Sequence, residues 1–104
     1  MAELDAVTAR YPRFLSEAAH LLTETLYEEA ALDRRTIELV LCSLLAGRGW
    51  ELGVRTHVAK AIEHGATPDE VRGAILLSFA VFGFSSAGPA LDWAEAALTE
   101  AGAA

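Results

Sequence analysis

The chain has 104 residues, enough for one domain, and 53% of them are hydrophobic. Its formal net charge of −7, with Lys60 as the single lysine, argues against nucleic acid or an anionic membrane as a partner. The single cysteine, Cys42, excludes an internal disulfide and any metal site built from several thiolates.

Apolar residues recur at helical spacing along the whole chain. A first helix is predicted from near Pro12 to about Glu29, with one apolar face that comprises Tyr11, Phe14, Leu15, Ala18, Leu22 and Leu26. Asp33 is a favourable N-cap for a second helix, which continues to about Ala46 and is apolar on nearly every side. Such a helix belongs in the middle of a bundle or against a subunit interface.

A third helix is predicted from Trp50 to about His64, after a glycine-rich break and with Gly65 as its C-terminal cap. The segment Thr67–Glu70 then combines an N-cap threonine, an early proline and a glutamate at the third helical position, which is typical of a helix start. A break is predicted over 83–88, followed by a short fifth helix.

These elements predict an all-α fold: a compact bundle of about five helices in a single domain over residues 1–104. The hydrophobic content exceeds what about 100 residues can bury, so we expect a homo-oligomer. No apolar run approaches the roughly 20 residues of a membrane span. The polar first ten residues differ from a signal peptide, and the expected location is cytoplasmic.

Two polar residues lie where the pattern calls for apolar ones. Glu38 is inside the apolar second helix, either on a polar edge that faces water or buried with a partner. His57 shares the apolar face of the third helix with Val54 and Ala61, either as a core histidine with a satisfied hydrogen bond or as a catalytic group.

The spacing of Glu38 and His57 favours contact between them. If the second and third helices form an antiparallel hairpin about Arg48, both residues lie roughly 14 Å from the turn, level on neighbouring helices. A carboxylate beside an imidazole fixes its tautomer and holds it in place, which is the outline of an acid–base pair.

Other candidates carry weaker signals. Cys42 is either a small buried hydrophobic residue or a reactive thiolate, which requires a nearby cation. The predicted substrate contacts are two arginines and three aromatic residues, with solvated arginines and packed rings as the alternative: Arg48, Arg55, Trp50, Phe82 and Phe84. The spacing of the remaining polar residues matches no metal or phosphate motif, so no cofactor is expected.

Three segments resemble the carboxymuconolactone decarboxylase and alkylhydroperoxidase-D (AhpD-like) superfamily, with the resemblance strongest over 32–98. They are Leu32–Leu39 at the start of an apolar helix, His57–Val71 with its His, Gly and Thr-x-x-Glu-Val pattern, and the aromatic and glycine-rich turn Phe82–Ala87. The resemblance implies a helical bundle that assembles into trimers or hexamers.

The alkylhydroperoxidase-D branch carries a Glu, a Cys-x-x-Cys pair and a His, and this chain keeps the first and last as Glu38 and His57. Trp50 and Gly53 occupy the cysteine positions. Without the two sulfurs, the redox chemistry of that branch does not carry over.

The decarboxylase branch also lacks the cysteine pair, and its resemblance implies proton transfer. We therefore hypothesise a cofactor-free enzyme of lyase or isomerase type, which acts on a small carboxylated or lactone metabolite. His57 would carry the proton and Glu38 would orient it. Two alternatives stay open: a non-catalytic helical module for binding or oligomerisation, and a peroxidase or thiol antioxidant that uses Cys42.

Overall fold

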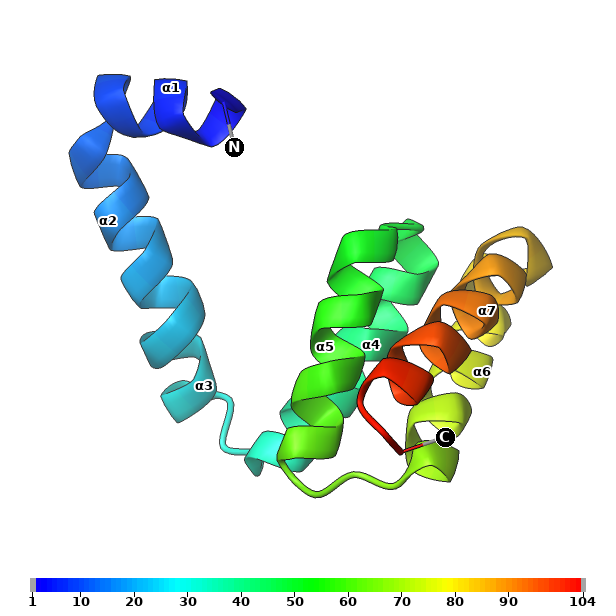
Figure 1. Ribbon diagram of the computed structural model, residues 1–104. Helices are drawn as coiled ribbons and strands as arrows, with labels where there is room; N and C mark the ends of the chain where they lie inside the picture. Colours follow the sequence, from blue (N-terminus) through cyan, green and yellow to red (C-terminus); the bar gives the residue numbers. More distant parts are fainter. Residues whose placement is uncertain (1, 104) are drawn as a thin grey trace. The chain divides into compact units, whose positions relative to one another are not determined.

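The computed structural model of the chain describes residues 2–103, with side chains from residue 5 onward. Every regular element within residues 2–103 is helical, which confirms the all-α prediction (Figure 1). The contacts divide the chain into two compact units, one up to Leu32 and one from Asp33 onward. A single domain over residues 1–104 stays a prediction.

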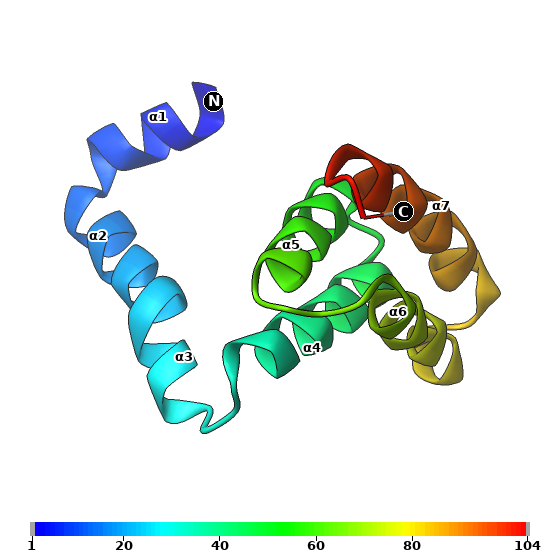
Figure 2. The same cartoon turned by 60° about the horizontal axis from the view of Figure 1, so that its bottom comes forward.

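The first unit contains α1 (Ala2–Arg10), α2 (Pro12–His20), a π-helical segment η1 (Leu21–Thr25) and α3 (Leu26–Glu29). The last three form one continuous rod (Figures 1 and 2), which confirms the helix predicted over this region. The π-helical turn and the separate α1 were not predicted. No residue of the rod is buried, and Phe14, Leu22 and Leu26 of its apolar face are exposed.

The second unit consists of α4 (Arg34–Arg48), α5 (Glu51–Glu63), α6 (Pro68–Phe82) and α7 (Phe84–Glu100). Helix α4 packs against the other three, and α7 packs against both α5 and α6. Small residues let these helices approach closely around a buried core that comprises Cys42, Ala46, Val54, Val58, Ala61, Val71, Ile75, Ala90, Ala94 and Leu98.

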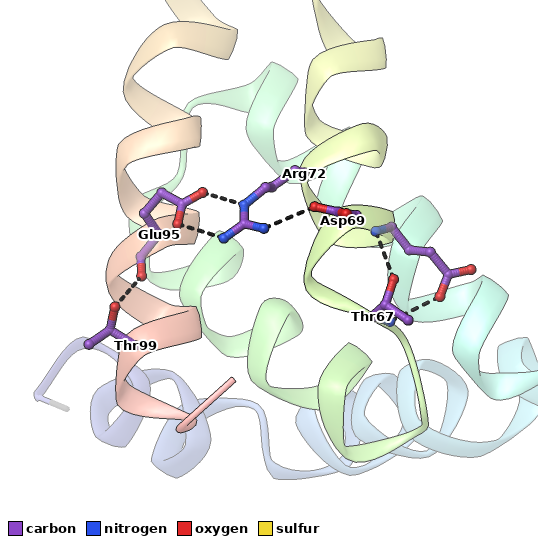
Figure 3. A network of polar contacts seen from close by, with 6 residues as sticks. Thr67, Asp69, Arg72, Glu95 and Thr99 are labelled. Atoms are coloured by element: carbon purple, nitrogen blue, oxygen red, sulfur yellow. Dashed lines mark hydrogen bonds and ion pairs between the residues drawn. The ribbon is translucent and has the colours of Figure 1, made fainter. Parts of the chain in front are cut away.

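Side-chain caps start α4 and α6 where the sequence predicted. The carboxylate of Asp33 accepts a hydrogen bond from the backbone N–H of Thr36 at 2.8 Å. At α6, Thr67 Oγ1 accepts from the backbone N–H of Glu70 at 3.1 Å, and the Glu70 side chain accepts from the N–H of Thr67 at 2.9 Å (Figure 3). This reciprocal capping box satisfies two backbone donors that the helix itself leaves open.

Helix α7 differs from the prediction of a break over 83–88 and a short last helix. Only Gly83 breaks the chain, with a φ of 84°, a conformation that glycine adopts at little cost. The helix then runs for 17 residues and has Pro89 inside it. Proline removes one hydrogen bond, to the carbonyl of Ser85, and burial of Ala87, Ala90, Ala94, Ala97 and Leu98 on one face outweighs that loss.

A cluster of three charged residues, Asp69, Arg72 and Glu95, joins α6 to α7. Arg72 of α6 donates two hydrogen bonds to the Glu95 carboxylate of α7, at 2.6 and 3.1 Å, and a third to Asp69 at 3.0 Å (Figure 3). The bonded guanidinium holds the pKa of Glu95 below its usual range. A carboxyl group with a lowered pKa in the folded state contributes stability above its unfolded pKa and loses that contribution as the pH falls.

Arg72→Gln is therefore expected to make the stability less sensitive to acid. Between about pH 6 and pH 3 the wild-type urea midpoint falls, in part because Glu95 takes up a proton and releases Arg72. The variant lacks this contribution, so its midpoint declines less over the same range. Parallel curves of urea midpoint against pH for the two proteins would show that the contact between Arg72 and Glu95 contributes no pH-dependent stability. Arg13→Gln is the matched control, because it removes an arginine from the exposed pair Arg13–Glu17.

Candidate functional site

Glu38 of α4 and His57 of α5 meet between the two helices. The Nδ1 atom of His57 lies 2.8 Å from Oε1 of Glu38, within hydrogen-bond distance. The predicted proximity of these residues is confirmed by this contact, and of the two interpretations of Glu38 the buried one is correct. A catalytic role for the pair stays a prediction.

The two side chains differ in their access to solvent. The Glu38 side chain is 0% exposed, whereas that of His57 is 19% exposed. An ionised carboxylate only accepts hydrogen bonds, so it binds the His57 tautomer that has its proton on Nδ1. The Nε2 atom then has a lone pair, and the imidazole is the member of the pair that a solute can reach.

Arg34 approaches the same carboxylate from one helical turn earlier. Its Nε atom lies 3.7 Å from Oε2 of Glu38, in an i, i+4 arrangement on α4. Burying a carboxylate is costly without compensating partners, and His57 and Arg34 offset that cost from two directions. Arg34 was not among the residues predicted from the sequence, although its spacing from Glu38 was a usable signal.

Cys42 is buried in the core one turn after Glu38, and its side chain is inaccessible. Burial, together with the negative charge of Glu38, raises the pKa of the Cys42 thiol to about 12. The residue is therefore a neutral thiol near pH 7. This environment favours the interpretation of Cys42 as a packing residue and is opposite to what a reactive thiolate requires.

Arg48, Trp50 and Phe82, three of the predicted substrate contacts, lie at the opposite end of α4 from Glu38. Arg48 and Trp50 flank the turn between α4 and α5, and the guanidinium carbon lies 5.3 Å from the centroid of the indole ring. The Phe82 ring packs where a Cβ on Gly47 would be. At about 1.5 Å per residue, this end of α4 is roughly 14 Å from Glu38.

Arg55 and Phe84, the other two predicted contacts, have different surroundings. Arg55 binds Glu51 at 2.8 Å and Glu100 at 3.4 Å, so two carboxylates already balance its charge. The exposed ring of Phe84 lies against Gly88, within its own helix. The structure thus brings together Glu38 and His57 and does not gather the five substrate contacts around them.

Trp50 and Gly53, at the positions of the redox cysteines in the related branch, pack against each other. A Cβ built on Gly53 would lie 2.6 Å from Cε3 of Trp50 and 2.9 Å from Cδ2 of Leu45. The indole ring thus covers the glycine, and the first turn of α5 has no room for a side chain at this position. Both positions serve packing in this chain.

Gly53→Ala is accordingly expected to lower the free energy of unfolding by about 1–3 kcal/mol, because the added methyl group forces the indole ring aside. Gly73 of α6 supplies a matched control, since a Cβ there meets nothing within 4 Å. Gly73→Ala is expected to raise the stability by about 0.5–1 kcal/mol through the helix preference of alanine. Urea unfolding of both variants measures the difference, and equal shifts of the same sign would contradict the packing described.

An open apolar groove between α4 and α6 was not predicted from the sequence. It encloses about 520 Å³ and is lined by Thr36, Leu39, Val40, Ser43, Leu44, Glu70, Gly73, Ala74 and Leu77. Neither Glu38 nor His57 lines it. The small residues of α6 that open the groove follow no motif, so the groove was not predictable from the sequence.

No group of three or more His, Cys, Asp or Glu side chains within residues 5–103 is arranged to hold a metal ion. In the same part of the chain, no helix combines the length and apolar character needed to cross a membrane.

One comparison with known proteins gives a family. The model of the carboxymuconolactone decarboxylase family matches residues 12–96, from the start of α2 into α7. The match confirms the resemblance noted over 32–98 and extends it toward the N-terminus. No curated protein and no solved structure matches the chain.

Proposed function

The chain belongs to the carboxymuconolactone decarboxylase family, and we propose that it is an enzyme that uses general acid–base chemistry without a cofactor. The proposed reaction is of lyase or isomerase type, on a small carboxylated or lactone metabolite. The observation that carries the proposal is the 2.8 Å contact between His57 Nδ1 and the fully buried Glu38 carboxylate.

Glu38 acts as the orienting group in this proposal, and His57 is the proton carrier. With Nδ1 bonded to Glu38, the Nε2 atom is the position that exchanges a proton with the substrate. The negative charge of Glu38 also stabilises the imidazolium form. This is the division of labour between a carboxylate and a histidine that general acid–base catalysis requires.

In a decarboxylation, the bond between the substrate carbon and its carboxylate breaks and carbon dioxide leaves. The electron pair of that bond passes to the remaining carbon skeleton as an enolate. His57, as an imidazolium, then gives its Nε2 proton to carbon and becomes a neutral imidazole, and water restores the proton. A site poor in water favours the loss of carbon dioxide and the protonation of carbon.

His57 requires a cover if water is to be limited, and we propose that a second copy of the chain provides it. The exposed apolar side chains of α6 support self-association; they are Leu76, Leu77, Phe79, Val81 and Phe82. Trimers and hexamers are the assemblies expected from the family resemblance, and sedimentation equilibrium measures the stoichiometry.

Carboxymuconolactone loss, followed in the wild type, His57→Ala and Glu38→Gln, tests the proposal. Both variants are expected to be slower than the wild type. Equal rates in all three proteins would remove the mechanism. A wild type inactive on this compound would direct the same comparison to other carboxylated lactones.

The same scaffold also supports a second candidate function, a non-catalytic module for binding or oligomerisation. The α4–α6 groove favours it, because this groove is apolar and lies apart from Glu38 and His57. A stable oligomer whose rates are unaffected by substitution of His57 would support this function over catalysis. The thiol antioxidant alternative has no comparable support, since the Cys42 thiol is buried and its pKa is raised.

A further inference from the structure

Helix α4 begins with two cations, which the helix dipole disfavours. Arg34 and Arg35 occupy its first turn, directly after the N-cap Asp33, whose carboxylate accepts a hydrogen bond from the N–H of Thr36. Arg35 is compensated by an ion pair with Glu70 of α6. Arg34 has its Nε atom buried, 3.7 Å from Oε2 of Glu38. A cation in this unfavourable place thus faces the carboxylate that holds His57.

We propose that Arg34 is a positioning residue that keeps Glu38 ionised and thereby decides which ring nitrogen of His57 carries the proton. The inference rests on the proposed function, because it takes Glu38 and His57 as the working pair. It adds a third residue, Arg34, which sets the direction of the hydrogen bond between Glu38 and His57.

The two protonation states of Glu38 give opposite tautomers of His57. A carboxylate accepts a hydrogen bond from Nδ1–H, which leaves a lone pair on Nε2 for use as a base. A carboxylic acid instead donates its O–H to Nδ1, which moves the histidine proton to Nε2. The charge on Glu38 therefore sets whether the reachable nitrogen of a neutral His57 takes or gives a proton.

The surroundings of Glu38 show why a cation is needed there. The carboxylate is fully buried, and burial without compensation favours the neutral acid. Cys42, one turn further along α4, supplies no positive charge, and its thiol is neutral near pH 7. The Arg34 side chain is 40% exposed, but its Nε atom and the Glu38 carboxylate are both buried, so their attraction is less screened than that between two surface charges.

Arg34→Gln and Arg34→Lys separate the charge of Arg34 from its bulk. Long-range proton–nitrogen NMR spectra at about pH 8.5, above the ordinary histidine pKa of about 6.5, show which nitrogen of each histidine bears the proton. We expect the Nδ1–H form of His57 to predominate in the wild type and in Arg34→Lys. In Arg34→Gln the share of the Nε2–H form is expected to rise above that of the wild type.

Arg35→Gln is the matched control, because it removes the same charge one residue away and breaks the contact with Glu70 instead. Its His57 tautomer is expected to be that of the wild type. Far-UV circular dichroism checks that each variant is folded. Arg34→Ala provides a second neutral variant should Arg34→Gln not fold.

The outcomes separate this inference from the proposed function. A wild type with Nδ1–H and an Arg34→Gln spectrum identical to it would overturn the role of Arg34 and leave the Glu38–His57 pair intact. A wild type with the proton on Nε2 would contradict both. The same rise of the Nε2–H form in Arg35→Gln would show that the net charge at the start of α4 sets the tautomer, not the contact of Arg34 with Glu38. It would also overturn the inference.

Discussion

His57→Ala is expected to lower kcat for decarboxylation by about 10²–10⁴-fold, the range that a positioned general acid or base contributes. The variant loses the group that exchanges the proton and one of the two groups that offset the burial of Glu38, so far-UV circular dichroism checks that it is folded. Glu38→Gln is expected to cause a smaller loss, because its amide still contacts Nδ1 but no longer stabilises the imidazolium. Steady-state rates measure both effects.

The effect should appear mainly in kcat, since neither substitution is expected to remove a group that binds the substrate in its ground state. His64→Ala is the matched control, because His64 caps α5 seven residues beyond His57 and is exposed. It is expected to retain the wild-type rate. A loss in His64→Ala equal to that in His57→Ala would show that the effect is unspecific and would contradict the assignment of His57.

Leu98→Ala is expected to lower the free energy of unfolding by about 2–5 kcal/mol, the usual cost of a cavity in a packed core. Leu98 is 0% exposed and belongs to α7, which forms part of the core of the second unit. The core cluster that contains Leu98 consists mostly of alanine and valine residues on packed helices, which have little freedom to fill the space. Urea unfolding at fixed protein concentration, with the slope compared between proteins, measures the loss.

Leu52→Ala on α5 makes the same chemical change at a side chain that is 55% exposed. It is expected to cost less than about 1 kcal/mol, because most of the removed surface already faces water. If Leu98→Ala lowers the free energy of unfolding by no more than Leu52→Ala does, the placement of α7 in the core is contradicted.

The sequence predicted the helix starts well, because capping is local chemistry. Asp33 and Thr67 each accept a hydrogen bond from a backbone N–H three residues later, and both bonds are present. The contact between Glu38 and His57 was also predictable, because an antiparallel hairpin fixes the level of each residue from its distance to the turn.

Features that depend on tertiary packing were missed. Residues 83–88 contain two glycines and two serines, which disfavour a helix locally, yet burial of the alanine face of α7 overrides that preference. Of the predicted substrate contacts, Trp50 packs on Gly53 and Phe82 on Gly47, contacts that no local pattern in the sequence indicated. The α4–α6 groove depends on which helix faces meet, and no local pattern reports that.

Trp50 and Gly53, at the positions that the resemblance assigns to the redox cysteines of the related branch, form a packing contact in this chain. Where that branch has a nucleophilic and a resolving thiol, an indole ring covers a glycine at the start of α5. The remaining cysteine is buried and is a neutral thiol near pH 7. The groups suited to proton transfer are therefore Glu38 and His57, with Arg34 beside them.

The most direct test of this account is the tautomer of His57 in the wild-type protein, which requires no knowledge of the substrate. A long-range proton–nitrogen NMR spectrum at about pH 8.5, with the signals assigned by their absence in His57→Ala, reports it. The account predicts a protonated Nδ1 that is bonded to Glu38 and a bare Nε2, and it predicts that Glu38→Gln weakens this preference. A proton on Nε2 in the wild type, or a spectrum unchanged in Glu38→Gln, would contradict it.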